Sequence, residues 1–313
     1  MRRVDGSPFV SVVIACHQGE AFLPASLESA LAQTHSRLEV VAVDDASNDA
    51  TPEILDAYAK EHPERVVVVH REATEGPCRA RRLGFERARG DFLCWLDQDD
   101  IWQPDKVERQ LAVMNEQPDV GLVYSYFDAF DSDTGTTIPW PDGRRDHEGD
   151  VLEQLFVEGC FIGSITTMVR RTALSTRGLQ IRDRDFSFGD DYYLWLSLAL
   201  DWKVARIPRV LAHYRRHAGN ESARLARERN VHLARVALLR EFVSEYPDAR
   251  ARLGPARRLA IGRHYGLAAM RALQDGDKLR GLRYLLRGAA SDPLMPIRHV
   301  RAARRLASSA DAD

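Results

Sequence analysis

Four short apolar runs, rich in β-branched side chains, constrain how the first third of this chain folds. The runs cover residues 9–16, 38–45, 65–70 and 91–97. Nearly continuous apolar character over so few residues is typical of strands that are buried on both faces of a parallel sheet. Segments with helical spacing separate the runs, and this alternation predicts right-handed crossovers in a doubly wound α/β sheet.

Helical spacing is found between these runs and directly after the last of them, over 21–33, 51–62, 78–89 and 104–117. Pro52 suits the first turn of its helix, where a missing N–H costs nothing, and Gly90 ends the third segment. Since all four strands run the same way, their carboxyl ends meet at one edge. Sheets of this kind bind their ligands beyond that edge.

The pattern changes in the second half of the chain. We expect strands over 120–130 and 160–171 and a helix from about Asp190. Beyond the segments 203–208 and 210–217, the spacing is helical from about Asn220 onwards. A polar segment rich in Asp, Gly and Pro covers 131–149 and is expected to be an exposed, mobile loop.

Composition limits the class of protein. Of the 313 residues, 29% are charged and 44% hydrophobic, which argues against extensive disorder. The four cysteines form no CxxC pair, so neither a zinc site nor a redox motif is indicated, and reduced thiols favour the cytosol. No apolar run reaches the roughly 20 residues of a membrane helix, and the first residues make a poor signal peptide. We expect a cytoplasmic protein, either soluble or peripheral at the inner face of the membrane.

The end of the chain is basic. Residues 251–313 contain 13 Arg or Lys and 5 Asp or Glu. Solvated faces of amphipathic helices are the favoured explanation, although such a charge also suits phosphates or an anionic membrane. Two Arg-rich amphipathic segments, 257–273 and 278–290, leave open a peripheral membrane contact, packing on the rest of the chain, or a homodimer. No nucleic-acid partner is expected.

Polar residues follow the four expected strands directly, and acidic ones dominate. They include His17, Asp44, Asp45, Asp97, Asp99 and Asp100. Three carboxylates within four positions repel one another unless a cation neutralises them, and Mg²⁺ or Mn²⁺ suits a cluster of oxygen ligands. Mg²⁺ usually takes only one or two protein carboxylates and completes its shell with water and substrate phosphate. The cluster therefore indicates a metal that bridges to a phosphorylated ligand.

Helix capping is the alternative for part of this cluster. Asp99 or Asp100 can serve the amino-terminal end of the helix expected near Pro104, where acidic groups are favourable. We expect Asp100 to do no more than prepare that helix. Three aspartates are more than one cap requires.

A second acidic pair, Asp190 and Asp191, begins a helix after Gly189. Both carboxylates can simply complement the helix dipole. Alternatively, one of them acts as a general base that removes a hydroxyl proton near a metal and a phosphate. Sequence spacing alone does not join this pair to the cluster at 97–100.

At this point the motifs resemble those of a known family. "VSVVIACHQGEAFLPASLESALAQTHSRLEVVAVDDASNDATPEIL", "GPCRARRLGFERARGDFLCWLDQDDIWQPDKVERQ" and "DDYYLWLSLALDWKVARIPRVLAHYRRHAGNES" are together similar to the family 2 glycosyltransferases. The likeness runs from about residue 9 to 222. It implies a GT-A fold, with a Rossmann-like, mostly parallel sheet flanked by helices.

The resemblance also implies a domain organisation. A catalytic domain is expected over 1–222, divided into a nucleotide-sugar-binding half at 1–105 and an acceptor-binding half at 106–222. A helical C-terminal extension is expected over 223–313.

Roles for individual residues follow from the same resemblance. Asp97 and Asp99 match the D-x-D motif that holds the metal and the nucleotide sugar, with Asp99 as the direct ligand. Asp44 and Asp45 match the pair that contacts the nucleoside. Ala15 and His17 fall where the family surrounds the base.

The second acidic pair matches the family's "ED" signature, which makes Asp191 the base, with Asp190 beside it. Arg81 matches the arginine of G-P-x-x-A-R-N-x-G and is expected to contact the nucleotide or diphosphate, although Arg82 replaces the usual Asn. Arg215 is a candidate for donor binding, and His217 for the metal.

The resemblance implies an inverting, metal-dependent transfer of a sugar from a UDP-, GDP- or dTDP-linked donor to a hydroxyl acceptor, with a lipid-linked acceptor among the options. Such enzymes build polysaccharides, glycoconjugates or glycosylated metabolites. Closure of 131–149 or 214–222 over the donor is a further expectation.

Two alternatives stay open. A nucleotidyltransferase also uses an α/β sheet with carboxylate-bound metal, but it needs a Gly-rich, basic loop after the first strand, and "ACHQGEAFLP" lacks one. A non-catalytic module could keep the nucleotide pocket and serve in a complex. Such a module has no need of both acidic clusters.

Overall fold

The computed structural model describes residues 7–138, 147–177, 190–220 and 231–294. The chain divides into two compact units, the first made of 1–151 with 161–218 and the second of 152–160 with 219–313. The proposed closing segments 131–149 and 214–222 fall partly outside the described residues.

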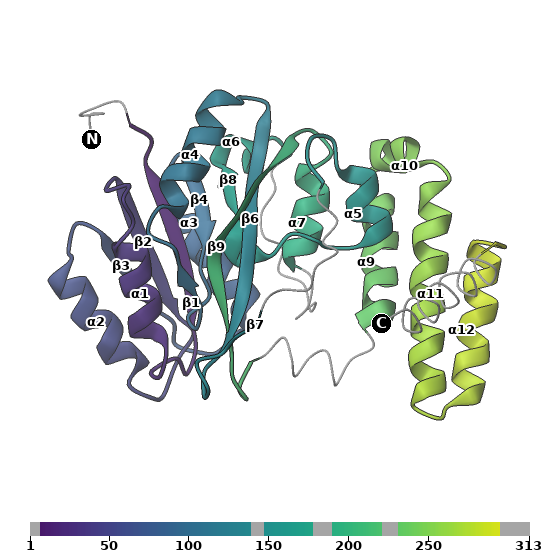
Figure 1. Cartoon of the computed structure of the whole chain (residues 1–313), viewed down its shortest axis with the longest axis horizontal. Helices are drawn as coiled ribbons and strands as arrows, with labels where there is room; N and C mark the ends of the chain where they lie inside the picture. The colour runs from purple at the N-terminus through teal and green to yellow at the C-terminus, as the bar shows by residue number, and fades with distance from the viewer. Residues whose placement is uncertain (1–6, 139–146, 178–189, 221–230, 295–313) are drawn as a thin grey trace. The chain divides into compact units, whose positions relative to one another are not determined.

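The first unit is built around one sheet. Among the described residues it has nine strands in the order β3-β2-β1-β4-β8-β6-β9-β5, with β7 paired to β6. The first four strands are β1 (Val10–Cys16), β2 (Leu38–Asp44), β3 (Val66–His70) and β4 (Phe92–Trp95). They pair in parallel, and almost every residue of β1, β2 and β4 is buried. The expected α/β fold with a mostly parallel, helix-flanked sheet is confirmed (Figure 1).

Four helices accompany these strands: α1 (Leu23–Leu31), α2 (Thr51–Glu61), α3 (Pro77–Arg87) and α4 (Lys106–Glu116). The first three carry a proline in their first turn, as the sequence suggested for Pro52. Gly84 brings α3 close to the sheet, because a Cβ at this position would lie 2.3 Å from Cγ1 of Val13. A larger residue there would push α3, and with it Arg81, away from β1.

The remaining strands are β5 (Ile101–Trp102), β6 (Val120–Asp131), β7 (Thr137–Ile138), β8 (Met168–Arg170) and β9 (Lys203–Arg216). β9 is one long strand that covers the segment 203–208 and nearly all of 210–217. It runs parallel to β6, with register shifts near Tyr126. It also pairs with β5, placing Ile101 opposite His213. This pairing carries the end of β9 to the 97–100 segment.

The expected strand over 160–171 is wrong for most of its length. Only Met168–Arg170 forms a strand, and Ser164–Thr166 forms a 3₁₀ turn. The turn is favoured because side chains bond to backbone carbonyls in it and directly after it: Trp102 Nε1 donates to O of Ile165, Gln110 Nε2 to O of Thr166 and Lys106 Nζ to O of Thr167. Apolar alternation in the sequence does not reveal such partners. The short helices α6 (Arg171–Ser175) and α7 (Asp190–Leu198) complete this unit.

The second unit is helical. It contains α5 (Leu152–Glu158), α9 (Val231–Glu245), α10 (Pro247–Leu253), α11 (Ala256–Gln274) and α12 (Lys278–Ser291). Phe156 of α5 and Phe242 of α9 are fully buried and lie 6.2 Å apart, measured between ring centroids. Within the described parts of the chain, no helix is both long and apolar enough to cross a membrane.

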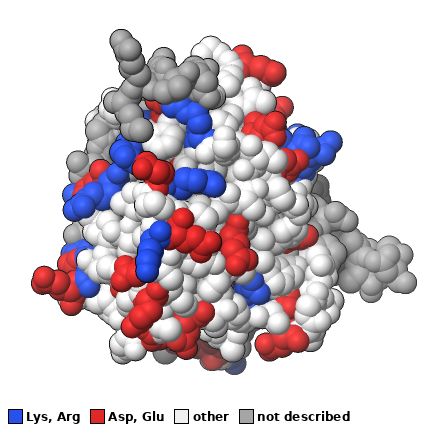
Figure 2. All heavy atoms as spheres, turned by 90° about the vertical axis from the view of Figure 1, so that its left-hand side faces the viewer, with Lys and Arg blue, Asp and Glu red and all other residues white. Residues whose placement is uncertain are grey.

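Charge on the surface is mixed. Figure 2 shows one face of the molecule, on which acidic and basic side chains are interspersed rather than gathered by sign. The described part of this face therefore offers no extended basic surface of the kind that binds nucleic acid.

Candidate active site

Gln98 ties the segment after β4 to the end of β1. The backbone N–H of His17 donates to Oε1 of Gln98 at 2.9 Å, and Nε2 of Gln98 donates to O of His17 at 2.9 Å. A Cβ at Gly19 would lie 2.3 Å from that Oε1, so glycine is needed for the close approach. Gln98 was missed from the sequence, because a neutral residue between aspartates gives no signal.

Helix α1 holds the same segment from the other side. Oγ of the buried Ser26 lies 2.8 Å from O of Gln98 and 2.7 Å from O of Asp100, so its one hydrogen is shared between two carbonyls. The backbone of 97–100 is thus fixed by β1 and α1. Its aspartates are presented on a rigid support.

Arg81 joins the two acidic clusters that the sequence could not connect. Its Nη2 donates to Oδ1 of Asp97 at 2.9 Å, and its Nη1 donates to Oδ2 of Asp190 at 3.3 Å. Burial alone would lower the pKa of Arg81, but Asp97 and Asp190 outweigh it and raise that pKa. The guanidinium of α3 therefore fixes the start of α7 beside the end of β4.

An aromatic stack supports the same contact. The rings of Trp95 on β4 and Trp195 on α7 lie 4.9 Å apart with 4° between their planes, and Phe85 meets Trp95 edge-on at 5.3 Å. Both tryptophans are buried. Their apolar packing holds α7 against the sheet. Trp95 lies two residues before Asp97, and Trp195 lies one helical turn after Asp191, so the stack is close to both acidic residues.

The carboxyl group of Asp191 has a raised pKa. Its Oδ1 accepts from the backbone N–H of Tyr192 at 2.7 Å. Burial first, and then the charge of Asp190, raise the pKa of Asp191 to about 7, although Arg81 offsets part of the effect. A carboxyl group with a pKa near neutrality can both accept and release a proton under physiological conditions.

Asp99 faces His217 across the site. Oδ2 of Asp99 lies 2.9 Å from Nε2 of His217, and the backbone O of Asp99 accepts from Nε of Arg215 at 2.8 Å. Burial, and then the charge of Asp97, raise the pKa of Asp99. The ring of His217 also packs on Phe22, with centroids 4.6 Å apart. The end of β9 thus meets the D-x-D segment directly.

Asp100 does not serve the next helix, and the expectation that it prepares a helix from Pro104 is wrong. Helix α4 begins at Lys106 with Asp105 at its N-cap, and β5 lies between it and Asp100. Oδ1 of the fully buried Asp100 accepts from the backbone N–H of Arg215 at 2.8 Å. Its Oδ2 has no hydrogen-bond partner among the described residues, and burial raises its pKa well above the usual range.

Arg215 is held between two aromatic rings. Its guanidinium lies 4.8 Å from the ring centre of Phe22 and 4.6 Å from that of Phe130. With Nε bonded to Asp99, this clamp fixes the end of β9 beside the acidic segment. Donor binding by Arg215 stays a prediction.

The paired aspartates after β2 are engaged by the protein itself. Asp45, which is 2% exposed, accepts from Nη1 of Arg71 at 2.8 Å and from the backbone N–H of Gly76 at 2.7 Å. Asp44 accepts from the backbone N–H of Ser47 at 3.0 Å, and its Oδ2 lies 3.1 Å from Nδ1 of His70. Asp44 and Asp45 therefore fix the conformation of the loops that follow β2 and β3.

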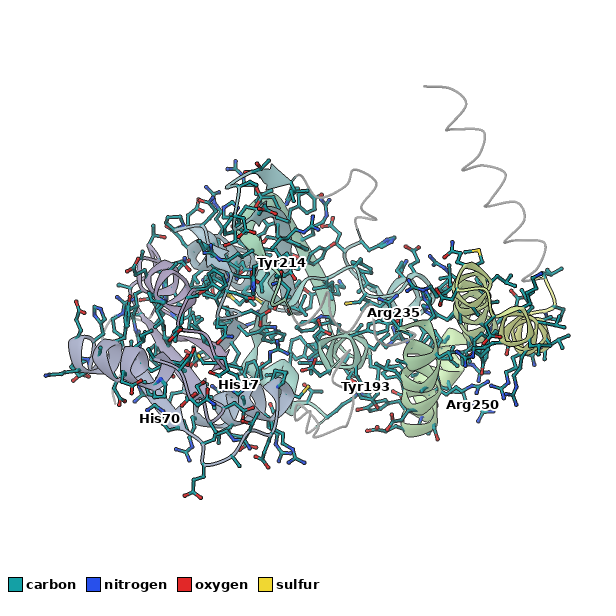
Figure 3. All side chains as sticks on the ribbon, turned by 90° about the horizontal axis from the view of Figure 1, so that it is seen from below. His17, His70, Tyr193, Tyr214, Arg235 and Arg250 are labelled. Carbon is teal, nitrogen blue, oxygen red and sulfur yellow. The ribbon has the colours of Figure 1, made fainter. Side chains whose placement is uncertain are left out.

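His70 at the end of β3 was missed from the sequence. Its second nitrogen, Nε2, lies 3.1 Å from Oδ1 of Asp56. Burial lowers the pKa of His70, but the bonds to Asp44 and Asp56 outweigh it and raise that pKa. Ala15, half-buried near the end of β1, and His17, exposed just beyond it, complete this side, and Figure 3 labels His17 and His70. Nucleoside contacts by Ala15, His17, Asp44 and Asp45 stay predictions.

Comparison with known proteins identifies the family. Residues 11–177, more than half of the chain, match the family described as glycosyl transferase family 2. The chain belongs to this family. The matched region includes Arg81, Asp97 and Asp99 and ends before Asp190, so the part played by α7 and β9 is read from the geometry of this glycosyltransferase.

Relatives and solved structures agree with that assignment. The putative teichuronic acid biosynthesis glycosyltransferase TuaG of Bacillus subtilis is 32% identical over 196 residues, which cover 61% of this glycosyltransferase and 72% of TuaG. The UDP-Glc:α-D-GlcNAc-diphosphoundecaprenol β-1,3-glucosyltransferase WfaP of Escherichia coli is 28% identical over 221 residues, 70% of this chain and 82% of WfaP.

Two solved structures share the fold. S. aureus TarS 1–349 in complex with UDP-GlcNAc has a TM-score of 0.60 at 16% identity, covering 90% of this chain and 91% of that one. The mannosyltransferase PcManGT of Pyrobaculum calidifontis, in complex with GDP-Man and Mn²⁺, has a TM-score of 0.59 at 20% identity, covering 93% and 82%. The GT-A fold of this glycosyltransferase is thereby confirmed.

The residues around Asp99 fit a divalent cation that is completed by its substrate. Among the described residues, no group of three or more His, Cys, Asp and Glu is arranged to hold a metal by itself. However, Asp99 Oδ2 and His217 Nε2 converge at 2.9 Å, and Asp100 Oδ2 is buried with no hydrogen-bond partner among the described residues. Mg²⁺ and Mn²⁺ need only one or two protein ligands when phosphate oxygens supply others. The donor set suits that arrangement.

Proposed function

We propose that this family 2 glycosyltransferase is an inverting, metal-dependent enzyme that moves a sugar from a nucleotide diphosphate sugar to an acceptor hydroxyl. One observation carries the proposal: Arg81 bonds to both Asp97 and Asp190. It brings a D-x-D carboxylate, a fixed positive charge and the Asp190–Asp191 pair into one site. Together these groups can activate the acceptor, hold the donor and offset the charge of the departing diphosphate.

Asp191 is the proposed base. As the acceptor oxygen attacks the anomeric carbon, its hydroxyl proton passes to the Asp191 carboxylate and the bond from that carbon to the diphosphate oxygen breaks. A single displacement from the face opposite the leaving group inverts the anomeric configuration, through an oxocarbenium-like state. Asp190, bonded to Arg81, keeps the start of α7 in place and helps to raise the pKa of Asp191.

The diphosphate of the donor is proposed to bind on the side of the site that carries Asp97, Asp99 and His217. Asp99, Asp97 and His217 would hold Mg²⁺ or Mn²⁺, whose charge offsets the negative charge that develops on the departing nucleotide diphosphate. Arg81, and in this proposal Arg215, add fixed positive charge there. Because Arg81 is held by two carboxylates, its charge is positioned before the substrate arrives.

Donor and acceptor are assigned by class. TarS and PcManGT are complexed with UDP-GlcNAc and GDP-Man, and WfaP is named for an acceptor sugar on diphosphoundecaprenol. We extend these classes to this chain as a proposal: a UDP-, GDP- or dTDP-sugar as donor, and the hydroxyl of a lipid-linked sugar diphosphate as acceptor. The pathway would be the synthesis of a polysaccharide or glycoconjugate.

The test is a release assay with UDP-, GDP- and dTDP-sugars, Mn²⁺ and a panel of lipid-linked acceptors. We expect acceptor-dependent release of the nucleoside diphosphate, with NMR showing an inverted anomeric centre. D191N should lose transfer, whereas binding of UDP is retained. A retained anomeric configuration, or full transfer by D191N, would reject the mechanism. Pyrophosphate release from a nucleoside triphosphate and a sugar 1-phosphate would instead identify a nucleotidyltransferase.

A further inference from the structure

Helix α12 of the second unit buries its two glycines and exposes three of its four leucines. Gly281 and Gly288 are its buried residues, whereas Leu279, Leu282 and Leu286 are 84%, 54% and 64% exposed. Amphipathic helices of globular proteins normally do the reverse and bury their leucines. We call these three residues, spaced at i, i+3 and i+7, the leucine stripe.

Helix α12 packs beside α11 (Figure 1), and glycines allow a close approach between them. A Cβ at Gly281 would lie 2.7 Å from Cδ2 of Leu273, and a Cβ at Gly262 of α11 would lie 2.6 Å from Cβ of Asp292. The two helices therefore approach closely at these glycines, and the leucine stripe stays largely exposed.

The charge of α12 is of one sign. Lys278, Arg280, Arg283 and Arg287 are all exposed, and the helix contains no Asp or Glu. The three arginines repeat at i, i+3 and i+7, one position after each leucine, so they form a row along the edge of the leucine stripe. An apolar stripe bordered by arginines is the arrangement that binds the interface of an anionic bilayer.

We propose that α12 binds the surface of an anionic lipid bilayer, with the leucine stripe at the acyl boundary and Arg280, Arg283 and Arg287 among the lipid phosphates. Charge decides between this occupant and a second copy of the chain. Two α12 helices brought face to face would set arginine against arginine. Asp277 at the N-cap already pairs with Arg280 at 3.2 Å, and the helix itself has no Asp or Glu to neutralise Arg283 and Arg287. Anionic lipid supplies that charge. The inference does not depend on the donor, the acceptor or the mechanism proposed above.

The experiment is flotation of the full chain with vesicles of phosphatidylcholine, alone or mixed with phosphatidylglycerol, at low and high salt. We expect binding to the mixed vesicles that weakens with salt. The combined variant R280Q, R283Q and R287Q should lose about 100-fold in partition onto mixed vesicles, at about fivefold per basic residue. A charge-matched control carries R250Q, R252Q and R258Q on α10 and α11. Its loss of partition onto mixed vesicles should be much smaller than that of the α12 variant.

The leucine variant L279Q, L282Q and L286Q separates insertion from simple charge attraction. We expect at least about a tenfold loss on mixed vesicles with all arginines in place, and unchanged thermal unfolding because these side chains are exposed. A wild-type chain that does not float overturns the proposal, whatever covers the stripe in solution. So does a leucine variant that floats as the wild type does but turns from dimer to monomer in sedimentation velocity.

Discussion

The indole ring of Trp195 stacks on that of Trp95 at 4.9 Å, with 4° between the two planes. This stack joins α7 to β4, whose sequence positions lie about one hundred residues apart. Asp97 follows Trp95 by two residues, and Asp191 precedes Trp195 by one helical turn. The stack therefore determines how far the proposed base lies from the D-x-D segment.

Removing the stack should damage both stability and transfer. Trp195 is completely buried, so W195A is expected to cost about 3–5 kcal/mol in the free energy of unfolding. W195F should be mild, because it keeps an aromatic face and the indole N–H has no hydrogen-bond partner among the described residues. Chemical denaturation and the transfer rate measure the two effects. Equal stability of W195A and W195F would contradict the assigned role.

The rate of transfer should rise with pH through the neutral range. Because the pKa of Asp191 is raised to about 7, a growing share of the carboxyl group is ionised as pH increases from 6 to 8. A base must be ionised to accept a proton. Below this pKa, kcat/KM should therefore increase up to about tenfold for each pH unit, and above it kcat/KM should level off. The observed value belongs to the Asp190–Asp191 pair rather than to either residue alone. D191N should remove this limb and lower the rate by about 10²–10⁴-fold.

The charge of Arg81 should determine the pH at which kcat/KM rises. Arg81 lowers the pKa of Asp191, so R81Q is expected to shift the rising limb to higher pH as well as to weaken donor binding. R81K keeps the charge but loses the two-armed bond to Asp97 and Asp190, and it should leave the limb nearer its original position. The pH profile of kcat/KM distinguishes the two variants. A limb that moves to lower pH in R81Q would contradict the electrostatic argument.

The strands and the acidic clusters were readable from the sequence for a physical reason. Strands buried on both faces must be apolar throughout, and groups at parallel strand ends must share an edge. What the sequence did not reveal was that Asp97 and Asp190 bond to the same guanidinium, because Arg81 and the Trp95–Trp195 stack act across the fold. Local patterns carry no information about such partners.

Two local expectations failed because distant side chains decided the outcome. Asp100 resembles a helix cap in the sequence, but the backbone N–H of Arg215 competes for it and the helix begins later. The apolar run over 160–171 has the composition of a strand, yet Trp102, Lys106 and Gln110 take the carbonyls that a sheet partner would need. In both cases tertiary hydrogen bonds overrode local propensity.

Lys106 should make stability depend on pH in the alkaline range. Burial lowers its pKa from the usual 10.5 to about 8, so between these values the unfolded chain holds a proton that the folded chain has released. The free energy of unfolding should then rise with pH over this window, by about 3 kcal/mol relative to K106M.

Comparison with K106M removes the contribution of most other titrating groups. That variant loses the bonds to Gln110 and Thr167, which changes its stability at every pH but not the slope. Urea denaturation between pH 7 and 10 measures the difference. Parallel curves for the two chains would show that Lys106 titrates normally.

Removal of the divalent cation should abolish transfer, and Asp99 should determine how much cation is needed to restore it. Its Oδ2 lies 2.9 Å from Nε2 of His217, so the two donor atoms are close enough to bind one ion. EDTA is expected to stop nucleotide release and Mn²⁺ to restore it. D99N should reduce the rate at saturating Mn²⁺ by about 100-fold or more, as for other losses of transition-state charge stabilisation.

Binding of Mn²⁺ in the presence of UDP, followed by electron paramagnetic resonance, gives a readout apart from activity. D105N serves as the control because the side chain of Asp105 accepts from Nε of Arg109 and lies outside the cluster. Full activity in EDTA would exclude a required metal, and unchanged Mn²⁺ binding by D99N would move the site away from this residue.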